Sequence, residues 1–130
     1  MEKISLKTNQ RNVFIDITSQ VKAIVSQSNV KDGICVVYCP HTTGGITINE
    51  SYDPDVQDDL SFAMNKLVPN MKEFKHAEGN SDSHTKTSII GPSETLIIEN
   101  GKLMLGRWQG IYFAEFDGPR TREVWIKTIG

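Results

Sequence analysis

Cysteine is scarce in this sequence, and the scarcity limits how the chain can be stabilised. Only two of the 130 residues are cysteines, Cys35 and Cys39. If both lie on one strand, their Cα atoms are about 13 Å apart at the usual rise per residue, whereas a disulfide needs Cα atoms within about 7 Å. We therefore expect two free thiols, which fits a reducing compartment.

Long apolar runs and an excess of positive charge are also absent. The first residues, MEKISLKTNQRN, have no apolar run after their charges, and no stretch approaches the roughly 18 apolar residues of a membrane span. We therefore expect a cytoplasmic protein without signal peptide or membrane partner. The formal net charge of −2 lacks the basic excess of a nucleic-acid module, so no nucleic-acid partner is expected.

What the sequence does contain is typical of one globular domain. Hydrophobic residues make up 38% and charged residues 23% of the chain, and the length is near the commonest for a single domain. We therefore treat residues 1–130 as one domain, with no linker or repeat.

The apolar pattern predicts an α+β fold with two helices and about seven or eight strands. One helix follows Thr18, with Val21, Ile24 and Val25 on one face. A second begins at Asp53-Pro54, carries Val56, Leu60, Met64 and Leu67 on one face, and ends before Pro69. The strands are expected near residues 4–6, 13–17, 34–38 (a buried strand), 46–48, 96–99, 102–105, 111–116 and 123–127.

Two turns and one long loop connect these elements. Asn100-Gly101 between apolar runs is a strong hairpin signal. A second turn is expected at residues 117–120. Residues 70–88 are polar around Gly79-Asn80-Ser81-Asp82-Ser83 and are predicted to be a loop, which is often functional at this length.

Two polar segments hold all three histidines of the chain. His41 lies in the first, Cys39 to Gly45, and His76 and His84 in the second, 76–86. Histidine suits metal ligation and proton transfer, and three histidines beside carboxylates suit a zinc-type site with an open position. The spacing matches neither a zinc finger nor HExxH. The alternative is that His41 is a hydrogen-bonded residue at a strand end and the other two are solvated.

Other residues near these segments have two interpretations each. Glu50 ends an apolar strand and could face the site as a base, and Cys39 could act as a nucleophile. Gln109 could orient a ligand or form a turn. The hydroxyls and backbone of 42–45 could hold an anion, or simply turn the chain. Four cations could contact phosphate or lie on the surface: Lys86, Arg107, Arg120 and Arg122.

Four strings resemble the YjbQ-type family, also called the secondary thiamine-phosphate synthase family. They occur in order over residues 3–129: Cys39-Pro-His-Thr-Thr-Gly-Gly-Ile-Thr-Ile-Asn-Glu50, Asp53-Pro-Asp-Val56, the segment from His76 to His84, and Gly106-Arg-Trp-Gln-Gly-Ile-Tyr-Phe113. The resemblance implies a β-sandwich-like, mostly antiparallel α+β subunit that assembles as a homotrimer with sites near subunit boundaries. It also implies coupling of hydroxymethylpyrimidine diphosphate with thiazole phosphate, with loss of pyrophosphate.

The matching motifs imply a set of site residues. We expect a catalytic group of His41, Glu50, Lys86 and Gln109, with Glu50 as base or ligand and Lys86 meeting the anionic substrate. We expect His41, His76 and His84 to hold a divalent metal. Histidines suit zinc, whereas diphosphate chemistry usually uses magnesium held by oxygens. The alternative function is a non-catalytic trimer that binds metal or a small phosphorylated metabolite.

Overall fold

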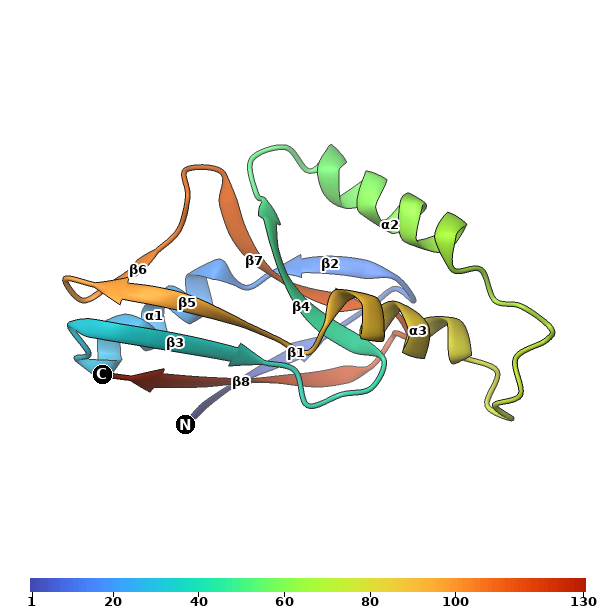
Figure 1. Cartoon of the computed structure of the whole chain (residues 1–130), viewed down its shortest axis with the longest axis horizontal. Coiled ribbons are helices and arrows are strands. Elements are labelled where there is room, and N and C mark those ends of the chain that lie inside the picture. Colours follow the sequence, from blue (N-terminus) through green and yellow to red (C-terminus); the bar gives the residue numbers. More distant parts are fainter.

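Eight strands form two antiparallel sheets in the computed structural model, which describes the whole chain, residues 1–130 (Figure 1). The larger sheet has the order β1-β8-β3-β5-β6 and the smaller β2-β7-β4. This confirms the predicted α+β, mostly antiparallel fold. The strands are β1 Glu2–Lys7, β2 Val13–Asp16, β3 Asp32–Tyr38, β4 Gly44–Glu50, β5 Ser93–Glu99, β6 Lys102–Met104, β7 Gln109–Glu115 and β8 Thr121–Ile129.

The main core lies between the inner face of the larger sheet, the smaller sheet and helix α1 (Thr18–Ser28). Alternation places every second side chain of β3 inward, so Cys35 and Val37 are buried. The outward residues Ile34 and Tyr38 are 37% and 40% exposed. The strand predicted over 34–38 is therefore buried on one side only, because only one face of the larger sheet is covered.

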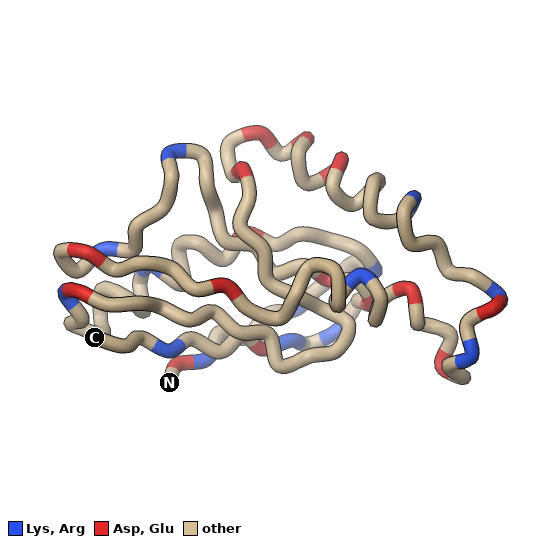
Figure 2. Tube along the Cα trace, in the orientation of Figure 1, with Lys and Arg blue, Asp and Glu red and all other residues tan.

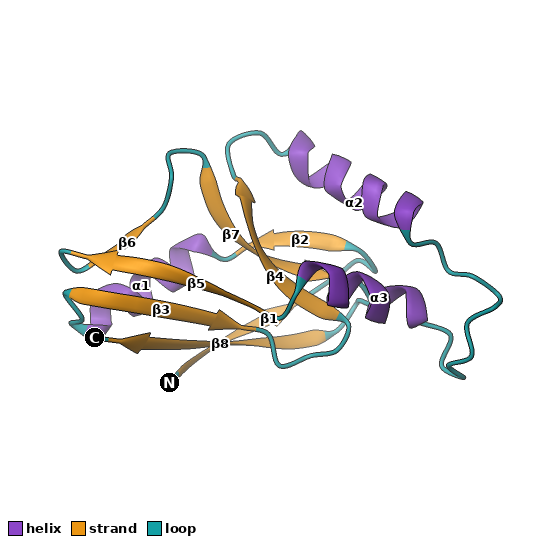
Figure 3. Ribbon diagram, viewed as in Figure 1, coloured by secondary structure: helices purple, strands orange, loops and turns teal.

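The smaller sheet is covered on its other side by two more helices (Figure 3). Helix α2 (Asp55–Leu67) packs beside β2, and helix α3 (Ser81–Ile90) packs against β4. The central strand β7 is therefore enclosed, and residues 110–115 are all buried. None of the three helices has the length and apolar character that crossing a bilayer would require.

Helix α3 is the main departure from the predicted elements, because residues 70–88 were expected to be a loop. The buried face of this helix is polar and consists of Asp82, Ser83, Lys86 and Thr87. Apolar residues therefore do not recur at helical spacing, and the pattern that reveals amphipathic helices is missing. The chain has three helices rather than the predicted two.

The buried polar face of α3 is matched by groups from distant elements. Arg11 donates to both carboxylate oxygens of Asp82, over 3.0 and 3.1 Å. The hydroxyl of Ser83 donates to the carbonyl oxygen of Phe116 over 2.5 Å. Because buried polar groups are costly without partners, these contacts explain how a polar helix face is tolerated in the interior.

Helix α2 follows the prediction except at its last turn. Met64 is buried as expected, but Leu67 is 75% exposed and Val68 is buried in its place. Steps of four residues therefore lead from Val56 through Leu60 and Met64 to Val68. The helix ends at Leu67, before Pro69, as predicted.

The two predicted turns have different roles. Asn100 and Gly101 have φ angles of 52° and 75° and connect β5 to β6 as a hairpin, which confirms the prediction. The turn at residues 117–120 instead joins β7 of the smaller sheet to β8 of the larger one. This crossing places the end of β7 beside the start of β8, where charged side chains are buried. Elsewhere acidic and basic residues are interspersed along the chain (Figure 2).

Candidate functional site

A polar pocket of about 500 Å³ lies at the end of the molecule remote from both termini (Figure 1). Its walls come from the connection between β3 and β4, the segment that enters α3, and the β7–β8 turn. All three histidines line it, as the sequence predicted. The lining is polar apart from one proline: Pro40, His41, Thr42, Thr43, His76, Glu78, Asn80, His84, Asp117, Arg120 and Arg122.

His41 is held where strand β3 stops alongside its neighbour β8. The ladder between them ends at the pair Tyr38–Trp125, so the N–H of Glu123, two residues earlier on β8, has no partner on β3. Nε2 of His41 accepts this N–H at 2.9 Å. Burial, reinforced by the charge of Arg122, holds the pKa of His41 below its usual value. A neutral ring whose Nε2 accepts must carry its proton on Nδ1.

Arg122 and Glu115 form a buried ion pair beneath the pocket. Nε and Nη2 of Arg122 both donate to the carboxylate of Glu115, and Nη2 also donates to the hydroxyl of Thr43 at 2.8 Å. Burial alone would raise the pKa of Glu115, but hydrogen bonds from Arg122, the Asp117 N–H and Thr8 together hold it below its usual value. Glu115 is fully buried and Arg122 is 4% exposed.

His76 and His84 face each other across the outer part of the pocket. Their ring centroids are 5.3 Å apart at an interplanar angle of 85°. His76 precedes α3, and His84 lies near the start of that helix. Nε2 of His76 lies 4.0 Å from Oε1 of Glu78. The His76 side chain is 48% exposed, and both rings belong to residues that line the pocket.

Asn80 and Arg120 together fasten the segment before α3 to the β7–β8 turn. Nδ2 of Asn80 donates to Glu78 at 3.0 Å and to Asp117 at 2.7 Å. Nη2 of Arg120 donates to Asp117 at 2.9 Å and lies 3.6 Å from Glu78. Burial opposes ionisation of Asp117, but the hydrogen bonds from Asn80 and Arg120 hold its pKa below the usual value. One wall of the pocket is thus held together by hydrogen bonds and ion pairs between these two segments.

The donor set of one chain does not fit the divalent metal that the sequence predicted. No group of three or more histidine, cysteine or carboxylate side chains is arranged to hold an ion. Nε2 of His41 is occupied by the Glu123 N–H, and the carboxylates of Glu78 and Asp117 are engaged by Asn80 and Arg120. The three histidines share a pocket without forming a ligand set. The contacts of His41 are those of the alternative interpretation, a hydrogen-bonded residue at a strand end.

Glu50 and Gln109 were expected beside the histidines, but the structure places them elsewhere. They pair with each other at the opposite end of strands β4 and β7 from the pocket. Six strand steps separate Gly44 from Glu50, which is about 20 Å. The Gln109 side chain accepts the Gly106 N–H at 2.7 Å, which is the turn role left open by the sequence.

Lys86 also lies outside the pocket lining. Its side chain is 1% exposed, with Nζ 2.5 Å from Oδ1 of Asn65 and 3.8 Å from Asp82. Burial lowers the pKa of this ammonium below its usual value, although the charge of Asp82 opposes the shift. These contacts join α3 to α2.

Neither cysteine has the surroundings of a nucleophile. Both thiols are free and buried, as predicted for the redox state. Burial raises the pKa of Cys35 to about 11 and also raises that of Cys39, whose Sγ lies 3.2 Å from the Gly44 carbonyl oxygen. Because the thiolate is the reactive form, these shifts disfavour a thiol mechanism.

The glycines of the predicted anion cradle serve packing instead. Gly44 and Gly45 belong to β4 and are buried. A Cβ atom on Gly45 would lie 2.7 Å from the Gly91 carbonyl oxygen, which accepts the Ile46 N–H. Only a glycine at position 45 allows the C-terminal end of α3 to lie this close to strand β4.

Several pocket residues were not singled out from the sequence. The sequence predicts Asn80 as part of the loop over 70–88, Asp117 as part of the turn at 117–120, and Glu115 as part of an apolar strand. Arg122, which the sequence offered as a possible phosphate contact, shares the inward face of β8 with Val124 and Ile126. A charged residue in such a series needs a buried partner, and Glu115 supplies it.

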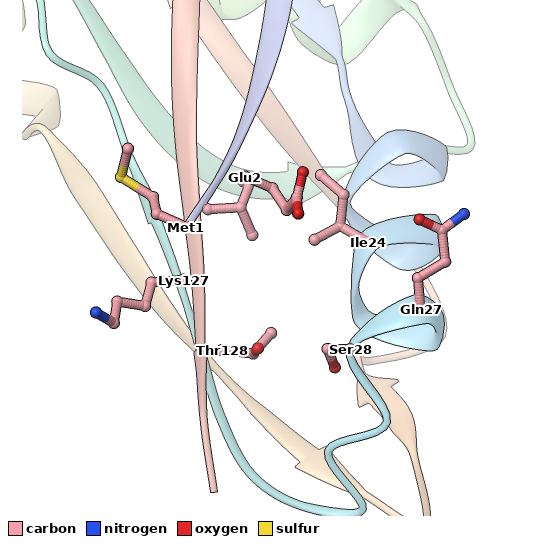
Figure 4. A pocket seen from close by; sticks show the side chains of 8 residues that line it. Met1, Glu2, Ile24, Gln27, Ser28, Lys127 and Thr128 are labelled. Carbon is pink, nitrogen blue, oxygen red and sulfur yellow. The ribbon is translucent and has the colours of Figure 1, made fainter.

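A second hollow of about 270 Å³ lies between α1 and the β1–β8 edge (Figure 4). Figure 4 shows its side chains around an open space. The lining is Met1, Glu2, Ile24, Gln27, Ser28, Ile126, Lys127 and Thr128. It gathers no histidine or arginine, so the polar pocket is the stronger candidate.

Comparison with known proteins matches the whole chain to one family. Residues 2–130 match the model of the family described as UPF0047 protein YjbQ-like. The UPF0047 protein of Methanocaldococcus jannaschii is 54% identical over 128 residues, which cover 98% of this chain and 93% of the relative. The Bacillus subtilis UPF0047 protein YugU is 47% identical, with 100% and 99% coverage.

Solved structures agree with the fold. An uncharacterized YjbQ/UPF0047 protein from Clostridium acetobutylicum superposes with a TM-score of 0.97 at 56% identity, covering 99% of this chain and 100% of the other. A YbjQ-like protein of unknown function from Sulfolobus solfataricus gives a TM-score of 0.96 at 30% identity, with 99% and 95% coverage.

Proposed function

The chain belongs to the UPF0047 family of YjbQ-like proteins, and on this premise we propose that it is a small-molecule enzyme acting on a phosphorylated substrate in the polar pocket. One observation carries the proposal: three histidines and two arginines line one hollow whose size suits a metabolite. Arginine matches phosphate geometry, and histidine transfers protons near neutral pH.

The specific reaction proposed is coupling of the thiamine-phosphate synthase kind. A nitrogen of thiazole phosphate forms a bond to the methylene carbon of hydroxymethylpyrimidine diphosphate, while the bond from that carbon to the diphosphate oxygen breaks. Cations that neutralise the departing pyrophosphate lower the barrier. Arg120 and the protonated forms of His76 and His84 are suited to this, and either histidine can give the leaving group a proton.

A non-catalytic binding protein is the second candidate. Its support is the charge balance of the pocket, where Glu78 and Asp117 offset Arg120 and Arg122. His41 and Arg122 are also fastened by structural hydrogen bonds. Rigid, balanced lining suits holding a phosphorylated metabolite as well as transforming it.

We also propose the homotrimer, with the outer face of the larger sheet as its contact surface. Ile34 pairs in register with Ile97 on one side and Ile129 on the other, and Ile97 with Met104. These four side chains form an apolar row across the sheet, each between 37% and 58% exposed. Contiguous apolar surface of this kind marks association sites. The two free thiols fit the proposed cytoplasmic location.

Product formation tests the function. Purified protein is incubated with the two substrates, and thiamine phosphate and pyrophosphate are measured together. We expect His84→Gln to reduce turnover by at least about tenfold while the fold is retained. Asp59→Asn, at an exposed position of α2 outside the pocket, serves as the control and should leave turnover unchanged. Binding of both substrates without product would favour the binding protein instead.

A further inference from the structure

We propose that Arg122 and His41 form a preformed seat for one phosphate group on the floor of the polar pocket. The inference rests on the proposed function, because it uses the same pocket. It goes further by dividing that pocket into two parts. The floor anchors a non-reacting phosphate, and the outer part, with His76 and His84, faces the reacting groups.

The first half of the seat is the unused end of Arg122. Nε and Nη2 of this side chain are taken by Glu115 and Thr43, whereas Nη1 has no partner in the protein. Nη1 is not one of the buried atoms that lack a hydrogen-bond partner, so this unpaired nitrogen retains some exposed surface. Since Arg122 lines the pocket while only 4% exposed, Nη1 is the atom through which it reaches the hollow.

The second half is the free nitrogen of His41. Its Nε2 accepts the Glu123 N–H, so the neutral ring carries its proton on Nδ1 and presents a donor. Nδ1 has no hydrogen-bond partner in the protein, and the ring lines the same pocket. The backbone fixes this tautomer, whereas His76 and His84 have no such constraint.

The groups left free on the floor of the pocket favour an anion over a cation. Both carboxylate oxygens of Glu115 are used: Oε1 accepts from Thr8 and Arg122, and Oε2 from Arg122 and the Asp117 N–H. The remaining free groups are N–H donors. Because they are held before binding, little reorganisation is needed when an oxyanion arrives.

The ligand class is therefore a small molecule with a terminal phosphate. Such a group offers three acceptor oxygens to fixed donors from two directions, and a hydrogen bond from the charged guanidinium to a phosphate oxygen is stronger than one between neutral groups. In the proposed coupling, the thiazole phosphate keeps its phosphate throughout, so that group is the natural occupant of the seat. The diphosphate that departs then lies toward His76, His84 and Arg120.

The test uses inorganic phosphate as probe, with acetate as a carboxylate comparison, measured by calorimetry. The informative variant is His41→Gln, because the glutamine oxygen can still accept the Glu123 N–H while the donor to the pocket is lost. We expect phosphate affinity to fall at least about fivefold in His41→Gln. The control, Asp59→Asn on the exposed face of α2, lies outside the pocket and should change affinity by less than about twofold. Acetate should bind more weakly than phosphate.

Side-chain NMR of the unmodified protein provides a measurement that does not depend on any variant folding. Nitrogen spectra should show His41 protonated on Nδ1 at neutral pH, and its signal and that of Arg122 Nε should move on phosphate addition. No binding up to about 10 mM phosphate, or shifts confined to His76 and His84, overturns the seat. Equal or tighter binding of acetate overturns the phosphate assignment. Thiamine phosphate production judges the proposed function separately, so the two failures are distinguishable.

Discussion

Nε2 of His41 lies 2.9 Å from the backbone nitrogen of Glu123 and accepts its hydrogen bond. One side chain thus extends the ladder of strand β8 past the end of β3 while it also lines the polar pocket. In this arrangement the lone pair of Nε2 is engaged by the backbone rather than free for a ligand.

The His41–Glu123 hydrogen bond should be visible as a pH dependence of stability. The folded state holds the pKa of His41 below 6.5 by burial, so the unfolded chain takes up the proton first. Its contribution to stability is complete above about pH 6.5 and is lost as pH falls below that value. Urea unfolding across this range should show a shallower decline for His41→Gln than for the unmodified protein.

Replacing His41 by alanine should cost stability at every pH. Without an acceptor the Glu123 N–H loses its partner, and we expect a loss of about 1 kcal/mol in the free energy of unfolding. His41→Gln should recover most of it. Equal losses in both variants would show that packing of the ring, rather than the hydrogen bond, is what matters.

The buried pair of Glu115 and Arg122 should be among the most sensitive places in the chain. Glu115→Gln leaves the guanidinium without its counter-charge, and breaking a buried pair typically costs about 3 kcal/mol. Because the folded pKa of Glu115 lies below its ordinary 4.5, its contribution is present above about pH 4.5 and is lost on further acidification. The exposed Asp59→Asn on α2 should stay within about 0.5 kcal/mol; a similar change in both variants contradicts the pairing.

Lys86 separates a structural role from a catalytic one. Its ammonium contacts Asn65 and Asp82 between α2 and α3. Lys86→Met keeps much of the volume, so thermal unfolding should shift while phosphate binding stays within about twofold. If the variant melts normally but loses binding or turnover, Lys86 acts on the substrate as the motif resemblance implied.

Metal analysis decides whether the chain binds a divalent ion, as the histidine motif implies, or binds none, as the arrangement of side chains in one chain indicates. We expect fewer than one divalent ion per chain after purification, and no rise in melting temperature on adding zinc, because a tightly bound ligand would stabilise the folded state. A stoichiometric ion that disappears in His76→Ala would overturn this expectation. It would also imply that a neighbouring subunit completes the ligand set.

The trimer contact should depend on the apolar row of the larger sheet. Ile97→Lys places a charge at its centre and should convert the trimer to smaller species in light scattering. Phe62→Lys on α2, at a side chain 69% exposed, is the matched control and should leave the mass unchanged. A monomeric unmodified protein contradicts the trimer, and an unaffected Ile97→Lys contradicts the contact surface.

The sequence by itself determined the elements whose side chains alternate between core and solvent. The spacing of Val21 and Val25 identifies α1, and positive φ at Asn100 and Gly101 was foreseeable from their residue types. Clustering of the histidines was also predictable, because two polar segments hold them all. These features depend on local periodicity and local backbone preference, which neighbouring residues express directly.

Tertiary structure alone decided the rest. Helix α3 escaped prediction because its buried face is polar and is stabilised by Arg11 and other distant groups. Glu50 stands in a motif with His41, yet an extended strand carries it to the far end of the sheet. Arg122 meets Glu115 only because the β7–β8 turn crosses between sheets. A charged group's function depends on partners distant in sequence, and only the folded chain brings them together.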